Sequence, residues 1–234
     1  MEFSIIIPTF NEEKRIEDTV REIYKYFAKR GKDFEIIVVD DGSSDGTVGF
    51  LVNLKKEFKN LKILVQGKNY GKGWAVKRGV LASKGKYILT KDADLSTPMA
   101  ETDKLLKELE AGADLAISCR IHPDGTDMRF NQPLIRRIVG KIFSKLVNLF
   151  VLKGISDTQA GTKMYKFEAA KKLFPEQKIK RIAFDVEILY LAKRTGMNIA
   201  VVPVMWSTDG KSRLRFFKEL RVLWDIFTIK LNHK

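Results

Sequence analysis

The sequence predicts an α/β protein, in which a mostly parallel β-sheet has helices on both faces and is followed by amphipathic helices. In the first half of the chain, short β-branched runs such as FEIIVV alternate with longer segments of helical periodicity. Strand–helix alternation at this spacing implies right-handed crossovers and parallel strands. Turns rich in aspartate and glycine follow two of these runs, in VVDDGSSDGT and LTKDADLSTP, which places polar groups at the ends of the expected strands.

The first half of the chain divides into alternating strands and helices. The expected strands are residues 3–7, 34–39, 61–65, 86–90 and 113–118. The expected helices are residues 12–30, 47–58, 73–82 and 98–110. Thr97 followed by Pro98 is typical of an N-cap with proline at the first helical position, so the last of these helices is expected to begin there.

The pattern changes after about residue 120. In order, we expect a polar loop over 122–132, a helix over 133–153, a polar turn over 154–163, a helix over 184–194, a strand over 198–204 and an amphipathic helix over 213–230. The chain has 234 residues, of which 44% are hydrophobic, and this is enough for one sizeable core. We therefore expect a single domain over residues 1–234, with halves at 1–120 and 121–212 and a C-terminal amphipathic helix over 213–234.

Composition limits the compartment and the partners. The single Cys119 excludes an intramolecular disulfide and a zinc site built from several cysteines, which fits a reducing cytoplasm. The first residues lack the features of a signal peptide, and no stretch approaches the ~20 apolar residues needed to span a bilayer. The net charge of +14 requires a polyanionic partner, and nucleic acid, anionic lipid or a phosphorylated substrate would each qualify.

The acidic turns are the expected site. Ligands of parallel α/β sheets bind outside the carboxyl ends of the strands, which here are residues 8–12, 40–47 and 91–97. Asp40 and Asp92 directly follow apolar runs, and a partly buried carboxylate is costly unless it is paired, hydrogen-bonded or bound to a cation. The alternative is structural, because aspartate and serine cap helices and glycine forms turns; for Ser43 and Asp45 this interpretation is equally good.

Asp92, Ala93 and Asp94 form a D-A-D sequence at the end of a strand. Two carboxylates at this spacing offer oxygen ligands to Mg²⁺ or Mn²⁺, which are usually held by one or two carboxylates together with substrate phosphates. The ion would neutralise a diphosphate and help it to leave. A bare DxD is a weak signal, and its weight comes from a second acidic strand end nearby.

Other phosphate-binding and hydrolytic motifs are missing. The glycines of Gly71-Lys72-Gly73 are followed by Val76 where the dinucleotide fingerprint requires a third glycine, and no GxxxxGK[ST] occurs. The two histidines, one in the 122–132 loop and one near the C-terminus, indicate no Ser–His–Asp arrangement. A dinucleotide enzyme and a P-loop NTPase are therefore not expected.

Four segments in order, SIIIPTFNE, EIIVVDDGSSDGT, NYGKGWAVKRG and DADLSTP, resemble the inverting family 2 glycosyltransferases of GT-A fold. Within that family the chain resembles the dolichyl-phosphate glucosyl- and mannosyltransferases, and ISDTQAGTKMY and RIAFDVEILYLAKR are most similar to the glucose branch. The resemblance covers nearly the whole chain. It implies transfer of a hexose from a nucleotide-sugar to dolichyl or another polyprenyl phosphate, with UDP-glucose as the favoured donor and GDP-mannose as the alternative.

The resemblance also implies roles for single residues. Asp94 is expected on the metal with Asp92 beside it, and Asp40 is expected to contact the nucleoside. Ser96 stands where mannose-transferring relatives often have glutamine, which favours glucose. Residues 1–120 would form the donor half and residues 121–212 the acceptor half. The residues expected to bind the donor and its metal are Pro8, Phe10, Asn11, Glu12, Asp40, Asp41, Lys72, Arg78, Asp92, Ala93, Gln159, Lys211 and Ser212.

The acceptor is inferred from a missing motif. Many family members have a catalytic acid before a QxxRW segment, and this chain has no QxxRW. An acceptor phosphate is already anionic at neutral pH and needs little base, so catalysis would consist mostly of positioning and charge neutralisation. Arg120 and Arg136 are the favoured phosphate ligands because guanidinium binds phosphate as a planar fork, although each could be a solvated surface charge. With Asp92 and Asp94 they form the expected catalytic set, and Asp185 is expected to face the site.

Two helices predict contact with a membrane. Residues 133–153 and 213–230 each combine a wide apolar face with lysine and arginine, which suits an anionic bilayer surface. The alternative is that both helices pack on the sheet or on a partner chain. We expect a peripheral protein on the cytoplasmic face of the membrane, with a membrane-protein partner or a homo-oligomer as a further possibility.

Rival functions fit the sequence less well. A nucleic-acid-binding module would suit the positive charge, but acidic strand ends would repel phosphate in the absence of metal, so no nucleic-acid partner is expected. A polysaccharide-directed enzyme of the same fold is disfavoured by the missing QxxRW and by the basic helices. An inactive scaffold is disfavoured by the retained Asp92 and Asp94.

Overall fold

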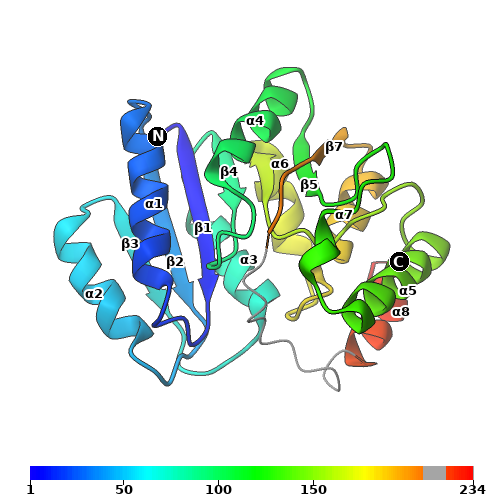
Figure 1. Cartoon of the computed structure of the whole chain (residues 1–234), viewed down its shortest axis with the longest axis horizontal. Helices are drawn as coiled ribbons and strands as arrows, with labels where there is room; N and C mark the ends of the chain where they lie inside the picture. Colours follow the sequence, from blue (N-terminus) through cyan, green and yellow to red (C-terminus); the bar gives the residue numbers. More distant parts are fainter. Residues whose placement is uncertain (208–219, 234) are drawn as a thin grey trace.

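Seven strands of the described residues form one sheet, with the order β3-β2-β1-β4-β6-β5-β7 (Figure 1). The computed structural model describes residues 1–207 and 220–233, but not the side chains of Arg136, Leu220, Arg221 and Leu223. The strands are β1 (Phe3–Thr9), β2 (Phe34–Asp40), β3 (Leu61–Val65), β4 (Tyr87–Thr90), β5 (Leu115–Cys119), β6 (Lys163–Lys166) and β7 (Ile199–Pro203). All the strands predicted from sequence are therefore present, with small shifts at their ends.

The strand β6 alone runs antiparallel to its neighbours β4 and β5. The other pairs, β1 with β2, β1 with β4, β2 with β3 and β5 with β7, are parallel. The strand β6 follows the predicted polar turn at 154–163, and its direction does not follow from the local sequence pattern. Insertion of β6 places the turn that precedes it beside the acidic turn that follows β4, because neighbouring antiparallel strands begin and end at the same edges.

The helices also follow the predicted pattern. They are α1 (Ile16–Lys29), α2 (Thr47–Glu57), α3 (Lys72–Ala82), α4 (Thr102–Glu110), α5 (Leu134–Phe150), α6 (Phe167–Leu173), α7 (Phe184–Arg194) and α8 (Leu220–Asn232). Short 3₁₀ helices cover Met99–Glu101, Met128–Asn131 and Phe174–Glu176. The helix α6 is the one α-helix of this set that has no counterpart in the sequence prediction.

The predicted start of the fourth helix is wrong. Pro98 has φ −55° and ψ 149°, so it precedes the 3₁₀ turn, and α4 begins only at Thr102. Thr97 makes no side-chain cap. Its carbonyl instead accepts a hydrogen bond from the ammonium of Lys91, a buried group whose position the local sequence pattern does not reveal.

Helices cover both faces of the sheet, as predicted (Figure 1). Side chains of β1 point alternately to the two faces, so Ile5 and Ile7 pack in the core cluster beneath α1, α2 and α4, while Ile6 packs in the cluster beneath α3, α6 and α7. The helix α8 joins the second cluster through buried residues that include Ile226 and Ile229. In the parts of the chain described here, no helix has both the length and the apolar character required to cross a bilayer.

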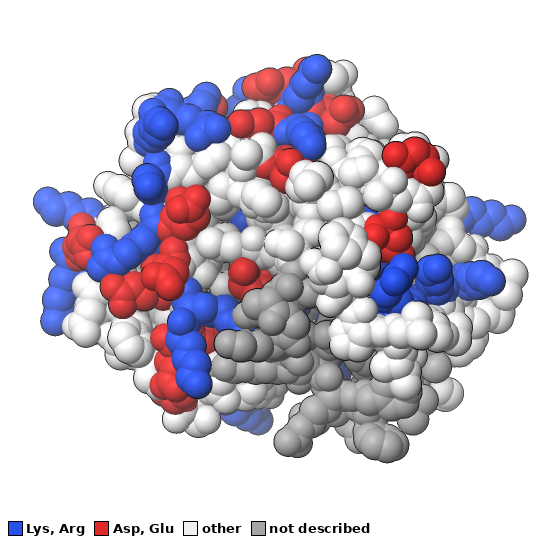
Figure 2. Space-filling model, viewed as in Figure 1, with Lys and Arg blue, Asp and Glu red and all other residues white. Residues whose placement is uncertain are grey.

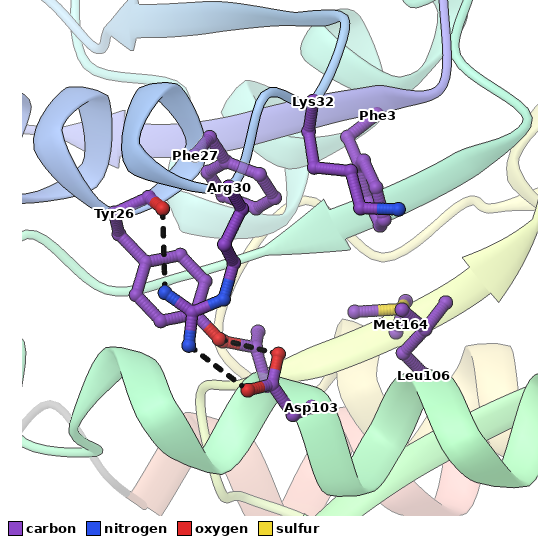
Figure 3. Close-up of a pocket in the computed structure, with 9 residues that line it drawn as sticks. Phe3, Tyr26, Phe27, Arg30, Lys32, Asp103, Leu106 and Met164 are labelled. Carbon is purple, nitrogen blue, oxygen red and sulfur yellow. Dashed lines mark hydrogen bonds and ion pairs between the residues drawn. The ribbon is translucent and has the colours of Figure 1, made fainter.

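A small hollow lies between α1 and α4, beside Phe3 at the start of β1 (Figure 3). The Tyr26 hydroxyl donates to Asp103 over 2.5 Å, and the Arg30 guanidinium pairs with the same carboxylate at 3.1 Å. Burial, together with the bond to Asp103, raises the pKa of Tyr26 to about 12. The hollow lies at the opposite end of β1 from the acidic turns, so it is not part of the site described below.

Candidate active site

The acidic turns meet at one edge of the sheet because the strands they follow are adjacent and parallel. In the register, Thr9 of β1 lies opposite Asp40 of β2 and Ile6 lies opposite Thr90 of β4. The amide of Asp41 donates to the carbonyl of Thr9 over 2.8 Å. The segments 8–12, 40–47 and 91–97 that the sequence selects therefore do share the carboxyl edge of these strands.

Asp40 is almost fully buried at the end of β2, with 1% of its surface exposed. Its Oδ2 accepts hydrogen bonds from the amides of Gly42 at 3.1 Å and Ser43 at 3.0 Å. Its Oδ1 is buried and has no hydrogen-bond partner among the described residues. A buried acceptor of this kind costs free energy unless a donor group reaches it, which fits the predicted contact with a nucleoside.

Asp41 has a structural environment. It accepts three hydrogen bonds of 2.8 Å, from the Gln66 side chain and from the amides of Tyr70 and Gly71. Burial raises the pKa of the Asp41 carboxyl, although the two amides act in the opposite direction. The side chain thus holds the segment that enters α3, while its predicted part in donor binding stays a prediction.

The turn after β1 is tied to the turn after β2. Asn11 has a φ of 57°, in the left-handed region, and its amide donates to Ser43 Oγ at 2.8 Å while its Oδ1 accepts from the amide of Ser44 at 2.8 Å. Asp45 accepts hydrogen bonds from the amide and hydroxyl of Thr47 at the start of α2. These contacts are compatible with the structural interpretation of Ser43 and Asp45.

The other predicted donor ligands of this turn lie at the same edge. Phe10 is 42% exposed and Pro8 is half-buried. The Glu12 carboxylate pairs with Arg15 Nε at 2.9 Å, and the Glu12 amide donates to Thr47 Oγ1 at 2.8 Å. Arg78 of α3 donates to the carbonyl of Val65 over 3.4 Å.

Asp92 forms an ion pair with Lys72, the first residue of α3, with 2.5 Å between Lys72 Nζ and Asp92 Oδ1. Burial alone would raise the pKa of Asp92, but the Lys72 ammonium outweighs it and holds that pKa below its usual value. Burial likewise acts to lower the pKa of Lys72, and the carboxylates of Asp92 and Asp185 more than offset it. Both groups are therefore charged at neutral pH.

Asp94 is exposed, and its Oδ1 accepts a hydrogen bond from the amide of Ser96 at 3.0 Å. Leu95 has a φ of 51°, so the backbone turns sharply between the acids and the end of the segment. Within residues 1–207 and 220–233, no group of three acidic, histidine or cysteine side chains gathers to form a closed metal cage. The exposed carboxylate of Asp94, two positions after Asp92, fits Mg²⁺ or Mn²⁺, which retain waters and take substrate phosphates alongside one or two carboxylates.

A second ion pair, which is buried, lies near the Lys72–Asp92 pair. Lys163 of β6 pairs with Asp185 of α7 at 2.7 Å, and its ammonium also donates to the carbonyl of Ala160 at 2.5 Å. Burial raises the pKa of Asp185, although the nearby Lys163 and Lys72 act against it. Asp185 therefore faces the charged interior beside Lys72 and Asp92, as expected. Lys163 is not among the residues predicted for the site, because no sequence motif distinguishes it from the other lysines of the chain.

On the acceptor side, Arg120 is held by Asp157. Arg120 Nε and Nη2 each lie 2.8 Å from a different oxygen of the Asp157 carboxylate, and the Arg120 amide donates to it at 2.9 Å. Burial would raise the pKa of Asp157, but Arg120 lowers it to about 2. The guanidinium also lies 5.5 Å from the centre of the Trp206 ring. The predicted phosphate ligand is thus oriented by a bidentate carboxylate.

The remaining predicted ligands are only partly described. Gln159 is half-buried, and its buried Nε2 has no hydrogen-bond partner among the described residues, so it is a donor available to a ligand. Position 136 lies on α5, with its side chain outside the described set. Lys211 and Ser212 also lie outside the described residues.

An apolar surface lies on α5 and α8. Figure 2 shows basic side chains along α5 beside a broad uncharged area. Phe150 of α5 and Phe227 of α8 join the two helices, with ring centres 5.1 Å apart. The exposed fractions of side chains on this surface are large: Leu134 68%, Ile135 62%, Ile138 48%, Ile142 52%, Leu149 70%, Trp224 71% and Leu231 62%. Because the two helices are in contact, these side chains form a group rather than isolated exposed apolar residues.

Comparison with known sequences places this geometry in a family. Residues 4–174 match the model of glycosyl transferase family 2. A dolichyl-phosphate beta-glucosyltransferase of Dictyostelium discoideum is 35% identical over 243 residues, which cover 98% of this chain and 74% of the relative. The human protein with that name is 34% identical over 246 residues, which cover 99% of this chain and 76% of the relative.

Solved structures with the same arrangement include glucosyl-3-phosphoglycerate synthase of Mycobacterium tuberculosis. Its complex with Mn²⁺, UDP and glucosyl-3-phosphoglycerate has a TM-score of 0.70 at 19% identity, and the match covers 98% of this chain and 78% of that chain. Its complex with Mn²⁺ and UDP-glucose has a TM-score of 0.67 at 18% identity, with the same coverage. At this identity the likeness establishes the fold, which is the GT-A fold expected from sequence. A family model matches most of the chain, and the two relatives align with almost all of it, so the chain belongs to glycosyl transferase family 2.

Proposed function

We propose that this protein transfers glucose from UDP-glucose to dolichyl or another polyprenyl phosphate, with inversion at the anomeric carbon and with Mg²⁺ or Mn²⁺. The observation that carries the proposal is that the Lys72–Asp92 pair, the exposed Asp94 and the Arg120–Asp157 pair lie at the same edge of the sheet, where β4 and β5 end on either side of β6. The names of the curated relatives support glucose and a dolichyl-phosphate acceptor, and they do not favour GDP-mannose or a nucleic-acid partner.

Residues 1–120 form the donor half in this proposal. The unpaired Oδ1 of Asp40 would accept a hydrogen bond from the nucleoside, and the exposed Phe10 would lie beside the base. Asp94, together with Asp92, would hold the divalent ion. When bound, the ion would neutralise charge on the diphosphate. Lys72 would then exchange its bond to Asp92 for a diphosphate oxygen, because it is the ammonium nearest to that carboxylate.

Residues 121–212 would form the acceptor half, together with Arg120 at the last position of the donor half. Arg120 presents a fork oriented by Asp157, and Arg136 on α5 would supply a second guanidinium to the acceptor phosphate. An anionic phosphate oxygen attacks the anomeric carbon directly, the bond to UDP breaks, and no general base is required. The chain's contribution is alignment and charge neutralisation. Gln159 Nε2 would donate to the sugar or to the acceptor phosphate.

The apolar surface of α5 and α8 would face the membrane that carries the lipid acceptor. Exposed Lys141 and Lys145 lie on α5 beside the apolar side chains, which suits anionic headgroups at the cytoplasmic face. In this arrangement the lipid phosphate would approach from the side of α5, on which Arg136 lies. The protein would be peripheral, lying on the bilayer surface.

The direct test is a panel of donors and acceptors with Mn²⁺. Purified protein is supplied with UDP-glucose, UDP-galactose or GDP-mannose, and with dolichyl phosphate or the phosphate-free dolichol. The proposal requires transfer from UDP-glucose to dolichyl phosphate, a β-linked product, loss of activity with EDTA and no transfer to dolichol. Transfer to dolichol at a comparable rate would contradict the base-free mechanism, and preference for GDP-mannose would contradict the assigned donor.

A further inference from the structure

Lys91 is a buried lysine immediately before the acidic turn, and the mechanism above does not use it. It directly follows β4, and 1% of its surface is exposed. Burial lowers the pKa of its ammonium to about 8, although the carboxylates of Asp92, Asp94 and Glu101 act against that change. Burying an ammonium is costly unless it is hydrogen-bonded and compensated by charge, so a lysine here needs a reason beyond filling space.

The hydrogen bonds of Lys91 join three segments of the site. Its Nζ donates to the carbonyl of Thr97, where the acidic turn ends, and to Thr162 Oγ1 at 3.5 Å. Thr162 directly precedes β6 and ends the turn that carries Asp157 and Gln159. The amide of Lys91 is fixed to the carbonyl of Ile6 at 3.0 Å, so the side chain projects from a rigid strand end. The Lys91 ammonium thus bonds the last residue of the acidic turn, Thr97, and the last residue of the turn before β6, Thr162.

These contacts differ from those of a structural ion pair. Lys163 pairs directly with a carboxylate, and so does Lys72. Among the described residues, the Lys91 ammonium donates instead to a backbone carbonyl and a hydroxyl, and the neighbouring carboxylates act on it through space. An apolar side chain of equal length would fill the same volume without tying the two turns together.

We propose that Lys91 is a positioning residue, which holds the Asp92–Asp94 turn at a fixed distance from the Asp157–Gln159 turn. This inference rests on the proposed function, because that function assigns donor binding to the first turn and acceptor binding to the second. Preorganisation of this kind raises affinity and rate because ligand binding does not have to order the turns.

Electrostatics alone predicts a different outcome on removal of Lys91. The negative charge of a nucleotide-sugar diphosphate and the positive charge of a divalent ion cancel, so losing one nearby ammonium changes the attraction for their complex only slightly. For the free ion, loss of a positive neighbour would strengthen binding. Weaker binding of the complex therefore reports the geometry of the turn rather than its charge.

The test compares Lys91→Met with Thr162→Val, which removes one of the two hydrogen-bond acceptors and keeps the volume. Lys107→Met, an exposed lysine on α4, is the matched control for the loss of charge. We expect Lys91→Met to bind UDP-glucose with Mn²⁺ about tenfold more weakly by calorimetry and to raise the KM for UDP-glucose by a similar factor. Thr162→Val should show a smaller change in the same direction, and Lys107→Met should match the unmodified protein. Thermal melting checks the fold of each variant.

A readout without ligand separates this inference from the proposed function. Amide hydrogen exchange in residues 92–97 and 157–162 should be about tenfold faster in Lys91→Met, with exchange in β1 and β2 unchanged. If the wild type showed no detectable binding of UDP-glucose with Mn²⁺, the proposed donor would be refuted, and the exchange test of Lys91 would still apply. The positioning role is overturned if folded Lys91→Met binds the complex within twofold of wild type or exchanges both turns at the wild-type rate. If Lys91→Met does not fold, unchanged affinity and exchange in Thr162→Val overturn it instead.

Discussion

Gly161 leaves no room for a side chain beside Asp92. A Cβ at position 161 would stand 2.5 Å from the Cγ of Asp92 and closer still to its Oδ2. The contact joins the turn before β6 to the turn after β4, which are far apart in the sequence. The position of Asp92, and of Lys72 that pairs with it, therefore depends on residue 161 having no side chain.

Gly161→Ala should displace the Asp92 carboxylate and lower the rate of sugar transfer by about a hundredfold, because catalytic groups shifted by about 1 Å lose this much. The rate is measured with UDP-glucose and dolichyl phosphate. Gly49→Ala is the control, because a Cβ at that position of α2 meets nothing within 4 Å. It should keep full activity and gain up to about 1 kcal/mol of stability. Wild-type activity in Gly161→Ala would show that Asp92 tolerates displacement.

Asp94→Ala should reduce transfer by roughly a thousandfold, because it removes the exposed carboxylate expected to hold the divalent ion. The fold should be unaffected, since the Asp94 side chain accepts a single hydrogen bond within the described part of the chain, from the amide of Ser96. Asp18→Ala, at an exposed acid of α1, is the control for lost charge. Steady-state rates over a range of Mn²⁺ concentrations are the measurement, and undiminished transfer by Asp94→Ala would refute the metal assignment.

The Arg120–Asp157 pair predicts a loss of stability in acid. The pKa of Asp157 is about 2 in the folded protein against a usual 3.8, so the ionised pair stabilises the fold above about pH 4. That stabilisation is lost as the pH falls through the folded pKa, and it amounts to about 2 kcal/mol.

The measurement is urea unfolding of the wild type and of Asp157→Asn between about pH 5 and pH 2. The difference in free energy of unfolding between the two proteins should shrink by about 2 kcal/mol over this range, because the asparagine does not titrate. A difference that stayed constant with pH would show that Arg120 does not lower the pKa of Asp157.

Replacing Trp224 and Leu231 together with glutamate should reduce co-sedimentation with anionic vesicles at least tenfold, if the α5–α8 surface binds lipid. Both side chains are largely exposed, so the fold should tolerate the change. The control is Val52→Glu with Val65→Glu, two exposed apolar side chains on α2 and β3. Equal co-sedimentation of the two double variants would assign the surface to a protein partner instead. High salt should also weaken wild-type binding, since basic side chains contribute to it.

The sequence by itself determined the element pattern and the edge of the sheet that holds the site. Residues 61–65 and 184–194 form β3 and α7 with the predicted bounds, and the aspartates follow the strands as expected. These features are local, because hydrophobic periodicity and turn residues act within a few positions along the chain. Parallel strands then bring their carboxyl ends together whatever the details of packing.

Only the tertiary structure decided which charges pair. Arg120 and Asp157, which the sequence suggests as a phosphate ligand and a turn residue, form a bidentate pair across 37 positions. Lys163 reaches Asp185, and Lys91 reaches Thr162, because β6 runs antiparallel between β4 and β5. A charged side chain has several possible partners in the sequence, and burial selects one of them by the cost of leaving a charge unpaired. That selection depends on distances between segments remote in the chain, which no local pattern encodes.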